Sequence, residues 1–119
     1  MTHHMKLKND PFRKILTGSK TIELRLYDEK RQLVKVGDRI EFTNLEDPSQ
    51  KILTEVKALH LFDTFAEMFR VLPPSAMGFE PGEKVDPKVM EHYYSTEEQG
   101  IYGTVGIELF LIEGTGNGE

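Results

Sequence analysis

The stretch Gly18-Ser19-Lys20-Thr21-Ile22-Glu23-Leu24-Arg25-Leu26-Tyr27 decides the fold of this chain. It opens with a glycine, the residue that most often ends a helix. After Lys20 apolar and polar side chains alternate, which is the period-2 pattern of a β-strand with one buried face. We therefore predict a strand over residues 20–27. Its apolar face would carry Ile22, Leu24 and Leu26, and its polar face Thr21, Glu23, Arg25 and Tyr27.

The polar face of this strand has two interpretations. Glu23 and Arg25 share it, because residues two apart in a strand point the same way. If the face meets bulk water, the two residues form a surface ion pair, which contributes about 0–1 kcal/mol to stability. If the face lines a pocket, the same residues form a site that offers both a cation and a hydrogen-bond acceptor.

The composition indicates a single globular domain. The chain has 119 residues, of which 38% are hydrophobic and 29% are charged. No apolar run approaches the roughly 20 residues of a membrane span, and the first residues lack a signal-peptide core. Cysteine is absent, which excludes disulfides and thiolate zinc sites. We predict a cytoplasmic protein with no membrane partner, no metal and no cofactor; the sequence leaves the oligomeric state open.

The charge balance restricts the class of ligand. Formal net charge is −5, from 15 Lys and Arg against 20 Asp and Glu. Sequence-independent binding of duplex nucleic acid relies on an excess of positive charge. The balance argues against an extended groove of that kind. It is compatible with a small basic cleft, because a single nucleotide needs only one or two cations.

Capping signals and periodicity predict the other elements. Asp10, Asp63 and Asp86 each have the position of an N-cap, and Ser95 and Glu98 have the spacing of a capping box. The first helix would end at Gly18, the second at Pro73, the third at Tyr94, and the turn after Ser95 would be broken by Gly100. Further strands are predicted over residues 3–7, 39–45, 51–61 and 103–112, with a turn at 46–49 and an irregular charged loop at 28–36.

These elements predict an α+β fold. About five strands and three or four short helices follow one another in hairpin-like order. The expected architecture is a small, mostly antiparallel β-barrel or strongly bent sheet with short covering helices. The helix after Asp63 would face the core with Phe65, Met68, Phe69 and Leu72. We predict one domain over residues 1–112 and a flexible, polar tail over residues 113–119.

The motif Gly18-x-Lys20-Thr21-x-Glu23-x-Arg25 resembles the signature of the ASCH domain family, a branch of the PUA-like superfamily. Three neighbouring features strengthen the resemblance, which spans residues 4–112: the helix start Pro11-Phe12, the turn Val36-Gly37-Asp38, and the last strand Tyr102-Gly103-Thr104-Val105-Gly106-Ile107-Glu108-Leu109.

The resemblance implies a PUA-like β-barrel with a cleft beside the first helix and the signature strand. The ligands it implies are RNA or a nucleotide or nucleoside. Lys20, Glu23 and Arg25 would line this cleft. Lys20 and Arg25 suit a phosphate or a carbonyl, and Glu23 can accept from a base amino group. Thr21, Arg25, Tyr94 and Ser95 are the predicted substrate-binding residues.

A hydrolase is the alternative that the resemblance leaves open. Some relatives remove the acetyl group of N4-acetylcytidine, with a threonine nucleophile at the position that Glu23 occupies here. This chain departs at that position, so Glu23 would instead act as a general base while Lys20 polarises the carbonyl. Other relatives are nucleases, for which Ser95 or Tyr94 could supply a hydroxyl. The catalytic residues of this alternative are Lys20 and Glu23.

Two segments keep more than one interpretation. His3 and His4 belong either to a solvated N-terminus or to a site, although adjacent strand residues cannot both face one metal ion. The loop over residues 75–84 is either a lid or a simple connection.

Overall fold

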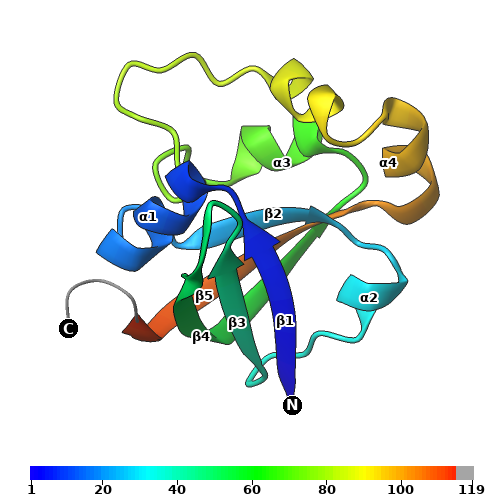
Figure 1. The fold of residues 1–119 in the computed structure, drawn as a ribbon. Coiled ribbons are helices and arrows are strands. Elements are labelled where there is room, and N and C mark those ends of the chain that lie inside the picture. The colour runs from blue at the N-terminus through cyan, green and yellow to red at the C-terminus, as the bar shows by residue number, and fades with distance from the viewer. Residues whose placement is uncertain (115–119) are drawn as a thin grey trace.

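The computed structural model describes residues 1–114 as a five-stranded sheet with short helices around it (Figure 1). The elements in chain order are β1 (Thr2–Leu7), α1 (Asn9–Thr17), β2 (Ile22–Leu26), α2 (Glu29–Gln32), β3 (Arg39–Asn44), β4 (Asp47–Phe62), α3 (Phe65–Val71), the 3₁₀ helix η1 (Pro87–His92), α4 (Thr96–Tyr102) and β5 (Thr104–Gly114).

The sheet has the strand order β1-β3-β4-β5-β2. β1 pairs in parallel with β3, and the other three neighbouring pairs are antiparallel. Register shifts interrupt the β4–β5 ladder at Leu53/Thr54 and Val56/Ala58, and such bulges bend a sheet and increase its twist. The sheet curls into a half-barrel, which confirms the predicted α+β, mostly antiparallel PUA-like fold.

Two apolar clusters hold the helices on the curled sheet. One joins α1 to β1, β3 and β4 and includes Phe12, Phe42 and Ile52. The other packs the apolar face of β2 against α3, which lies above β2 in Figure 1. It confirms the predicted core stripe of α3 and the apolar face of the signature strand, and contains Ile22, Leu24, Leu26, Phe65, Met68, Phe69, Leu72 and Met77.

The predicted starts and ends of the helices are confirmed only in part. Asp86 caps η1 as predicted, and Gly18 ends α1 with a left-handed φ of 85°. The predictions for Asp10 and Asp63 were wrong. α1 begins one residue before Asp10, with Lys8 in the capping position, so Asp10 lies in the first turn, where an acid is also favourable. α3 is capped by Thr64, whose hydroxyl accepts from the Glu67 N–H at 3.2 Å.

Two connections also differ from the prediction. Residues 28–36 contain the short helix α2, because Asp28 caps it by accepting from the Arg31 N–H at 3.1 Å. The predicted turn at 46–49 falls at residues 45–46 instead, where the Asn44 side chain accepts from the Glu46 N–H. β4 already begins at Asp47, and the adjoining ladder shifts register. Pro48 is tolerated there because a bulge does not need every N–H.

The end of the chain holds two further differences. α4 continues through Gly100 to Tyr102, because its capping box and the buried Gln99, which accepts from the Phe65 N–H at 3.1 Å, fix the helix on both sides. β5 extends to Gly114, two residues into the segment predicted as a tail. The rest of that segment lies outside the described residues. No helix in the described part of the chain is long and apolar enough to cross a membrane.

Candidate functional site

The signature stretch begins in the connection between α1 and β2. The left-handed Gly18 ends α1, and the Lys20 N–H donates to the carbonyl of Lys14 at 3.0 Å. The next two N–H groups, of Thr21 and Ile22, both donate to the carbonyl of Ala76 at 2.9 Å. Lys20 therefore precedes the regular strand. The alternation of side chains between the two faces of β2 does not apply to it, so its side chain can point to the same side as that of Glu23.

Lys20, Glu23 and Arg25 converge as a buried triad. Glu23 is only 4% exposed. Its Oε1 lies 3.1 Å from Lys20 Nζ, and its Oε2 lies 2.6 Å from Arg25 Nε. The Lys20 and Arg25 side chains are 10% and 12% exposed. Arg25 also donates from Nη2 to the Lys6 carbonyl at 2.9 Å, which ties β2 to β1. The part of the polar face that carries Glu23 and Arg25 is thus largely shielded from bulk water.

The opposite charges in the triad shift the pKa values of Glu23 and Arg25 so that both groups stay charged. Burial by itself would raise the pKa of the Glu23 carboxyl, but the attraction of Lys20 and Arg25 outweighs burial and lowers that pKa below its ordinary value of 4.5. Burial would lower the pKa of Arg25, and Glu23 again reverses the effect and raises it. At neutral pH the triad therefore holds one anion between two cations, with a net positive charge.

The triad lies in the wall of a cleft of about 310 Å³. This volume is at the lower end of the range of small-molecule pockets. Tyr94 lines it with a ring that stacks on Phe65, the centroids 5.7 Å apart. Burial raises the pKa of the Tyr94 hydroxyl. The full lining consists of Lys6, Leu7, Lys8, Pro11, Lys20, Glu23, Leu24, Arg25, Leu45, Met90, Tyr93 and Tyr94.

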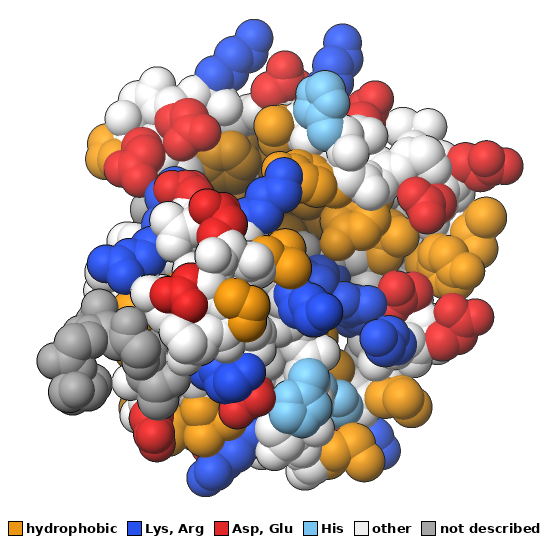
Figure 2. All heavy atoms as spheres, viewed as in Figure 1, with side chains coloured by type: hydrophobic (Ala, Val, Ile, Leu, Met, Phe, Trp, Pro, Cys, Tyr) orange, Lys and Arg blue, Asp and Glu red, His pale blue; other side chains and the backbone are white. Residues whose placement is uncertain are grey.

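The cleft is basic in an acidic protein. Four Lys or Arg side chains and a single carboxylate line it, although the whole chain has a formal net charge of −5. Figure 2 shows blue Lys and Arg side chains next to orange hydrophobic ones around a hollow in the viewed face. Lys8 places its Nζ 5.3 Å from the centre of the exposed Tyr93 ring. Cations and aromatic rings therefore occur together at the cleft.

The predicted site residues fall into two groups. Lys20, Glu23, Arg25 and Tyr94 all line the cleft. Thr21 does not: its side chain is exposed, and its backbone carbonyl accepts from the Leu109 N–H at 2.8 Å. Ser95 is also outside the lining, where it forms the predicted capping box with Glu98. The structure brings neither of these two residues to the triad.

Three of the four histidines form separate contacts with carboxylates. His3 lies 2.8 Å from Asp38, His4 lies 3.3 Å from Glu41, and His60 lies 2.9 Å from Glu108. Within residues 1–114, no group of three or more His, Asp or Glu side chains could hold a metal ion.

Several cleft residues were not predicted. Lys6, Lys8 and Leu45 come from the β1 end and the β3–β4 turn, and Met90 and Tyr93 come from η1 and its end. The alternation of lysines in residues 6–8 is visible in the sequence. The separation of more than 80 residues between Lys8 and Tyr93 gave no sign that they meet.

A second, larger hollow of about 580 Å³ lies between the end of β4, α3 and the start of β5. Its charged lining residues are Asp63, Glu67 and Arg70, and none of the predicted site residues borders it. It is more open than the cleft and lacks a buried charged group, so the cleft at the triad is the better candidate.

The family model of the ASCH domain matches residues 5–113, nearly the whole chain. The chain belongs to the ASCH domain family. Among the curated proteins, none matches this chain.

Solved structures show that ASCH relatives share the fold. The crystal structure of hypothetical protein PH0355 is 33% identical, with a TM-score of 0.81 over 94% of this chain and 100% of the other. The solution structure of protein PF0455 from Pyrococcus furiosus is 31% identical, with a TM-score of 0.73 over 95% and 99%. ZmASCH from Zymomonas mobilis has a TM-score of 0.67 over 96% of this chain and 72% of the other; at 14% identity it supports the fold alone.

Proposed function

We propose that this ASCH domain binds one nucleotide unit, either of single-stranded RNA or of a free nucleotide or nucleoside, in the cleft at the triad. The observation that carries the proposal is the convergence of Lys20 and Arg25 on the buried Glu23 beside Tyr94. The triad supplies fixed cations, an oriented acceptor and an adjoining aromatic ring. Those are the groups that bind a phosphate, a base edge and a base face.

Each group has a distinct part in the proposed complex. Arg25 and Lys20 are oriented by Glu23, so they meet a phosphate or carbonyl oxygen without first losing side-chain freedom. Lys6 and Lys8 add positive charge at the rim. Each Glu23 oxygen already accepts from a cation, and a carboxylate oxygen has a second lone pair for a base amino group. Tyr93 and Tyr94 offer rings for stacking.

Cleft size and overall charge limit the ligand. A volume of about 310 Å³ suits a single nucleoside or nucleotide. The acidic remainder of the surface repels a long polyanion, because salt screens like charges only in part when they are closer than a Debye length. We therefore expect one or two bound nucleotides per domain and no preference for duplex RNA.

Calorimetric titration tests the proposal. Cytidine 5′-monophosphate, cytidine and short single-stranded oligoribonucleotides are titrated into the wild type, Lys20→Met and the control Lys30→Met. Lys30 is exposed on α2, outside the cleft lining, and its loss changes net charge equally. We expect about tenfold weaker binding with Lys20→Met only, the effect of one lost charge-assisted contact. Absence of binding to the wild type, or equal binding by Lys20→Met, contradicts the proposal.

Hydrolysis of N4-acylated cytidine or of RNA by Lys20 and Glu23 stays a prediction. A general base is most effective when its pKa is near the working pH. The pKa of Glu23 is instead lowered, and both its oxygens already bind cations, which is why binding is placed first. Chromatography after incubation with N4-acetylcytidine or single-stranded RNA detects turnover. Turnover that survives in the double variant Lys20→Met with Glu23→Gln rules out the assigned residues.

A further inference from the structure

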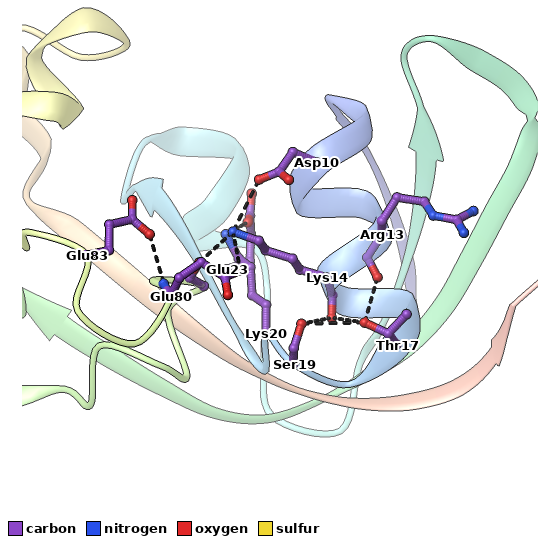
Figure 3. Close-up of polar contacts among 10 residues, drawn as sticks. Asp10, Arg13, Lys14, Thr17, Ser19, Lys20, Glu23, Glu80 and Glu83 are labelled. Carbon is purple, nitrogen blue, oxygen red and sulfur yellow. Dashed lines mark hydrogen bonds and ion pairs between the residues drawn. The ribbon is translucent and has the colours of Figure 1, made fainter.

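Lys14 joins α1 to the segment over residues 76–80. Its Nζ donates to the carbonyl of Gly78 at 2.8 Å and lies 3.3 Å from Asp10 Oδ2 and 3.4 Å from Glu80 Oε2. The side chain is 21% exposed. Figure 3 shows the Lys14 ammonium between Asp10 of α1 and Glu80 of the loop. One ammonium group thus fastens a loop to a helix.

The fastened segment packs against the Lys20 side chain. Gly78 has a left-handed φ of 101°, and a Cβ at this position would lie 3.1 Å from Lys20 Cδ and 3.6 Å from Cγ. Only glycine brings its backbone this close in such a conformation. Met77 next to it is 3% exposed in the core with α3, and the Ala76 carbonyl accepts from the first N–H groups of the signature strand. The segment is therefore held on three sides.

Lys14 also contacts Lys20 through the backbone. The Lys14 carbonyl accepts from the Lys20 N–H at 3.0 Å and from Ser19 Oγ at 3.3 Å. Lys14 thus fixes the start of Lys20 directly and its aliphatic stem through Gly78. A free lysine side chain samples many rotamers, and confining it costs entropy when a ligand binds.

We propose that Lys14 is a positioning residue of the cleft, which holds residues 76–80 against Lys20 and so keeps the Lys20 ammonium at Glu23. This part of the segment predicted as lid or connection acts as a wall that Lys14 holds in place. The ligand consequence rests on the proposed nucleotide binding; the position of Lys20 does not.

The test compares Lys14→Met with Arg13→Met. Both remove one positive charge from α1 and keep a long apolar stem, but Figure 3 shows Arg13 directed away from the cluster around Lys14. The first readout is the ¹³Cε and ¹Hε NMR signal of Lys20, assigned with Lys20→Arg. The second is the affinity for cytidine 5′-monophosphate. With Lys14→Met we expect a displaced Lys20 signal and about tenfold weaker binding; with Arg13→Met we expect neither.

Gly78→Ala provides a second, independent variant. It presses on the Lys20 stem while the Lys14 bond to the Gly78 carbonyl remains chemically available, so it also displaces the Lys20 signal if the packing positions that side chain. Lys14→Arg retains a cation and is expected to recover most of the wild-type signal.

The outcomes separate the two proposals. Coincident Lys20 signals in the wild type, Lys14→Met and Gly78→Ala overturn the positioning role, whatever the ligand does. A displaced signal in a protein whose wild type binds no nucleotide supports the positioning role and overturns the proposed function. If Lys14→Met does not fold, an unmoved Lys20 signal in Gly78→Ala still overturns the positioning role.

Discussion

Glu23 and Asp38 are two carboxylates of this domain that contact two and three cationic or hydrogen-bonding groups, respectively, in different surroundings. Glu23 lies between Lys20 and Arg25, with its side chain 5% exposed. Asp38 lies 2.8 Å from His3 Nε2 and 3.6 Å from the N-terminal amino group, with its side chain 18% exposed. The side chain of the amino-terminal residue beside Asp38 is itself 72% exposed. The two carboxylates have a similar number of partners, but the Asp38 side chain is more accessible to water than the Glu23 side chain.

The difference shows how burial changes the meaning of an ion pair. At Asp38, water can replace a lost partner, so the pair contributes little to stability. At Glu23, the loss of the carboxylate leaves two cations poorly solvated, and that penalty is larger than the net contribution of the intact cluster. A buried, charged cluster of this kind is weak evidence for stability by itself, and it suits a binding site.

The pKa values show the same contrast in their causes. The pKa of Asp38 is lowered first by the hydrogen bond from His3 and then by the Lys35 N–H, which lies 3.1 Å away. The pKa of Glu23 is lowered against a large opposing effect of burial, through the attraction of Lys20 and Arg25. Both pKa values are therefore lowered, that of Asp38 by local hydrogen bonds and that of Glu23 by buried charges.

Glu23→Gln is expected to have the largest effect. It leaves Lys20 and Arg25 without their anion, so we expect the free energy of unfolding to fall by about 3–5 kcal/mol, measured by urea denaturation at pH 7. Glu41→Gln is the control, because Glu41 pairs with an exposed histidine, His4. A loss for Glu23→Gln as small as that for Glu41→Gln would mean that water reaches the triad freely.

Lowering the pH tests the contribution of Glu23 to stability. Its pKa is lower in the folded state than its ordinary value of 4.5, so the unfolded chain takes up the proton first. The contribution of Glu23 to stability is complete above pH 4.5 and is lost as the pH falls through the folded-state pKa. We expect the stability difference between the wild type and Glu23→Gln to shrink below pH 4.5, in denaturation series from pH 7 to 3. A constant difference contradicts a lowered pKa.

Ser95→Ala examines a third carboxylate, Glu98, which belongs to the capping box of α4. The Glu98 N–H donates to Ser95 Oγ at 3.0 Å, and Glu98 Oε1 accepts from the Ser95 N–H at 3.1 Å. Losing the hydroxyl of an N-cap costs about 1 kcal/mol. We expect this loss in thermal unfolding and an unchanged affinity for cytidine 5′-monophosphate. A large change in affinity would return Ser95 to the binding residues.

Asp38→Asn is expected to have the smallest effect. The asparagine carbonyl can still accept from the Lys35 N–H, and water can solvate the exposed amino terminus. We expect the denaturation midpoint to shift less than for Ser95→Ala, and to approach the wild type as salt is added. A shift comparable with that of Glu23→Gln would remove the contrast between the two carboxylates.

Local patterns predicted much of the fold because they act over a few residues. The alternation in residues 22–26 fixed a strand, the stripe of α3 fixed its buried face, and Gly18 marked the end of α1. The same rules failed where neighbouring residues could each take the N-cap position. Lys8, and not Asp10, has that position in α1, and Thr64, and not Asp63, has it in α3. A local cap is worth only about 1 kcal/mol, which a tertiary contact can outweigh: at the start of α1 the Asn9 N–H donates to Glu46 Oε2 at 3.0 Å.

The sequence by itself determined that Lys20, Glu23 and Arg25 belong to one motif, and it placed Glu23 beside Arg25 through strand parity. The tertiary structure decided that the motif is buried and that Lys6, Lys8, Tyr93 and Tyr94 complete its cleft. It also decided that Lys14 contacts Gly78 and Glu80, and that Gly78 lies against the Lys20 side chain. Contacts between residues 60 or more positions apart depend on the strand order and curl of the sheet, which bring distant segments together and which no local pattern encodes.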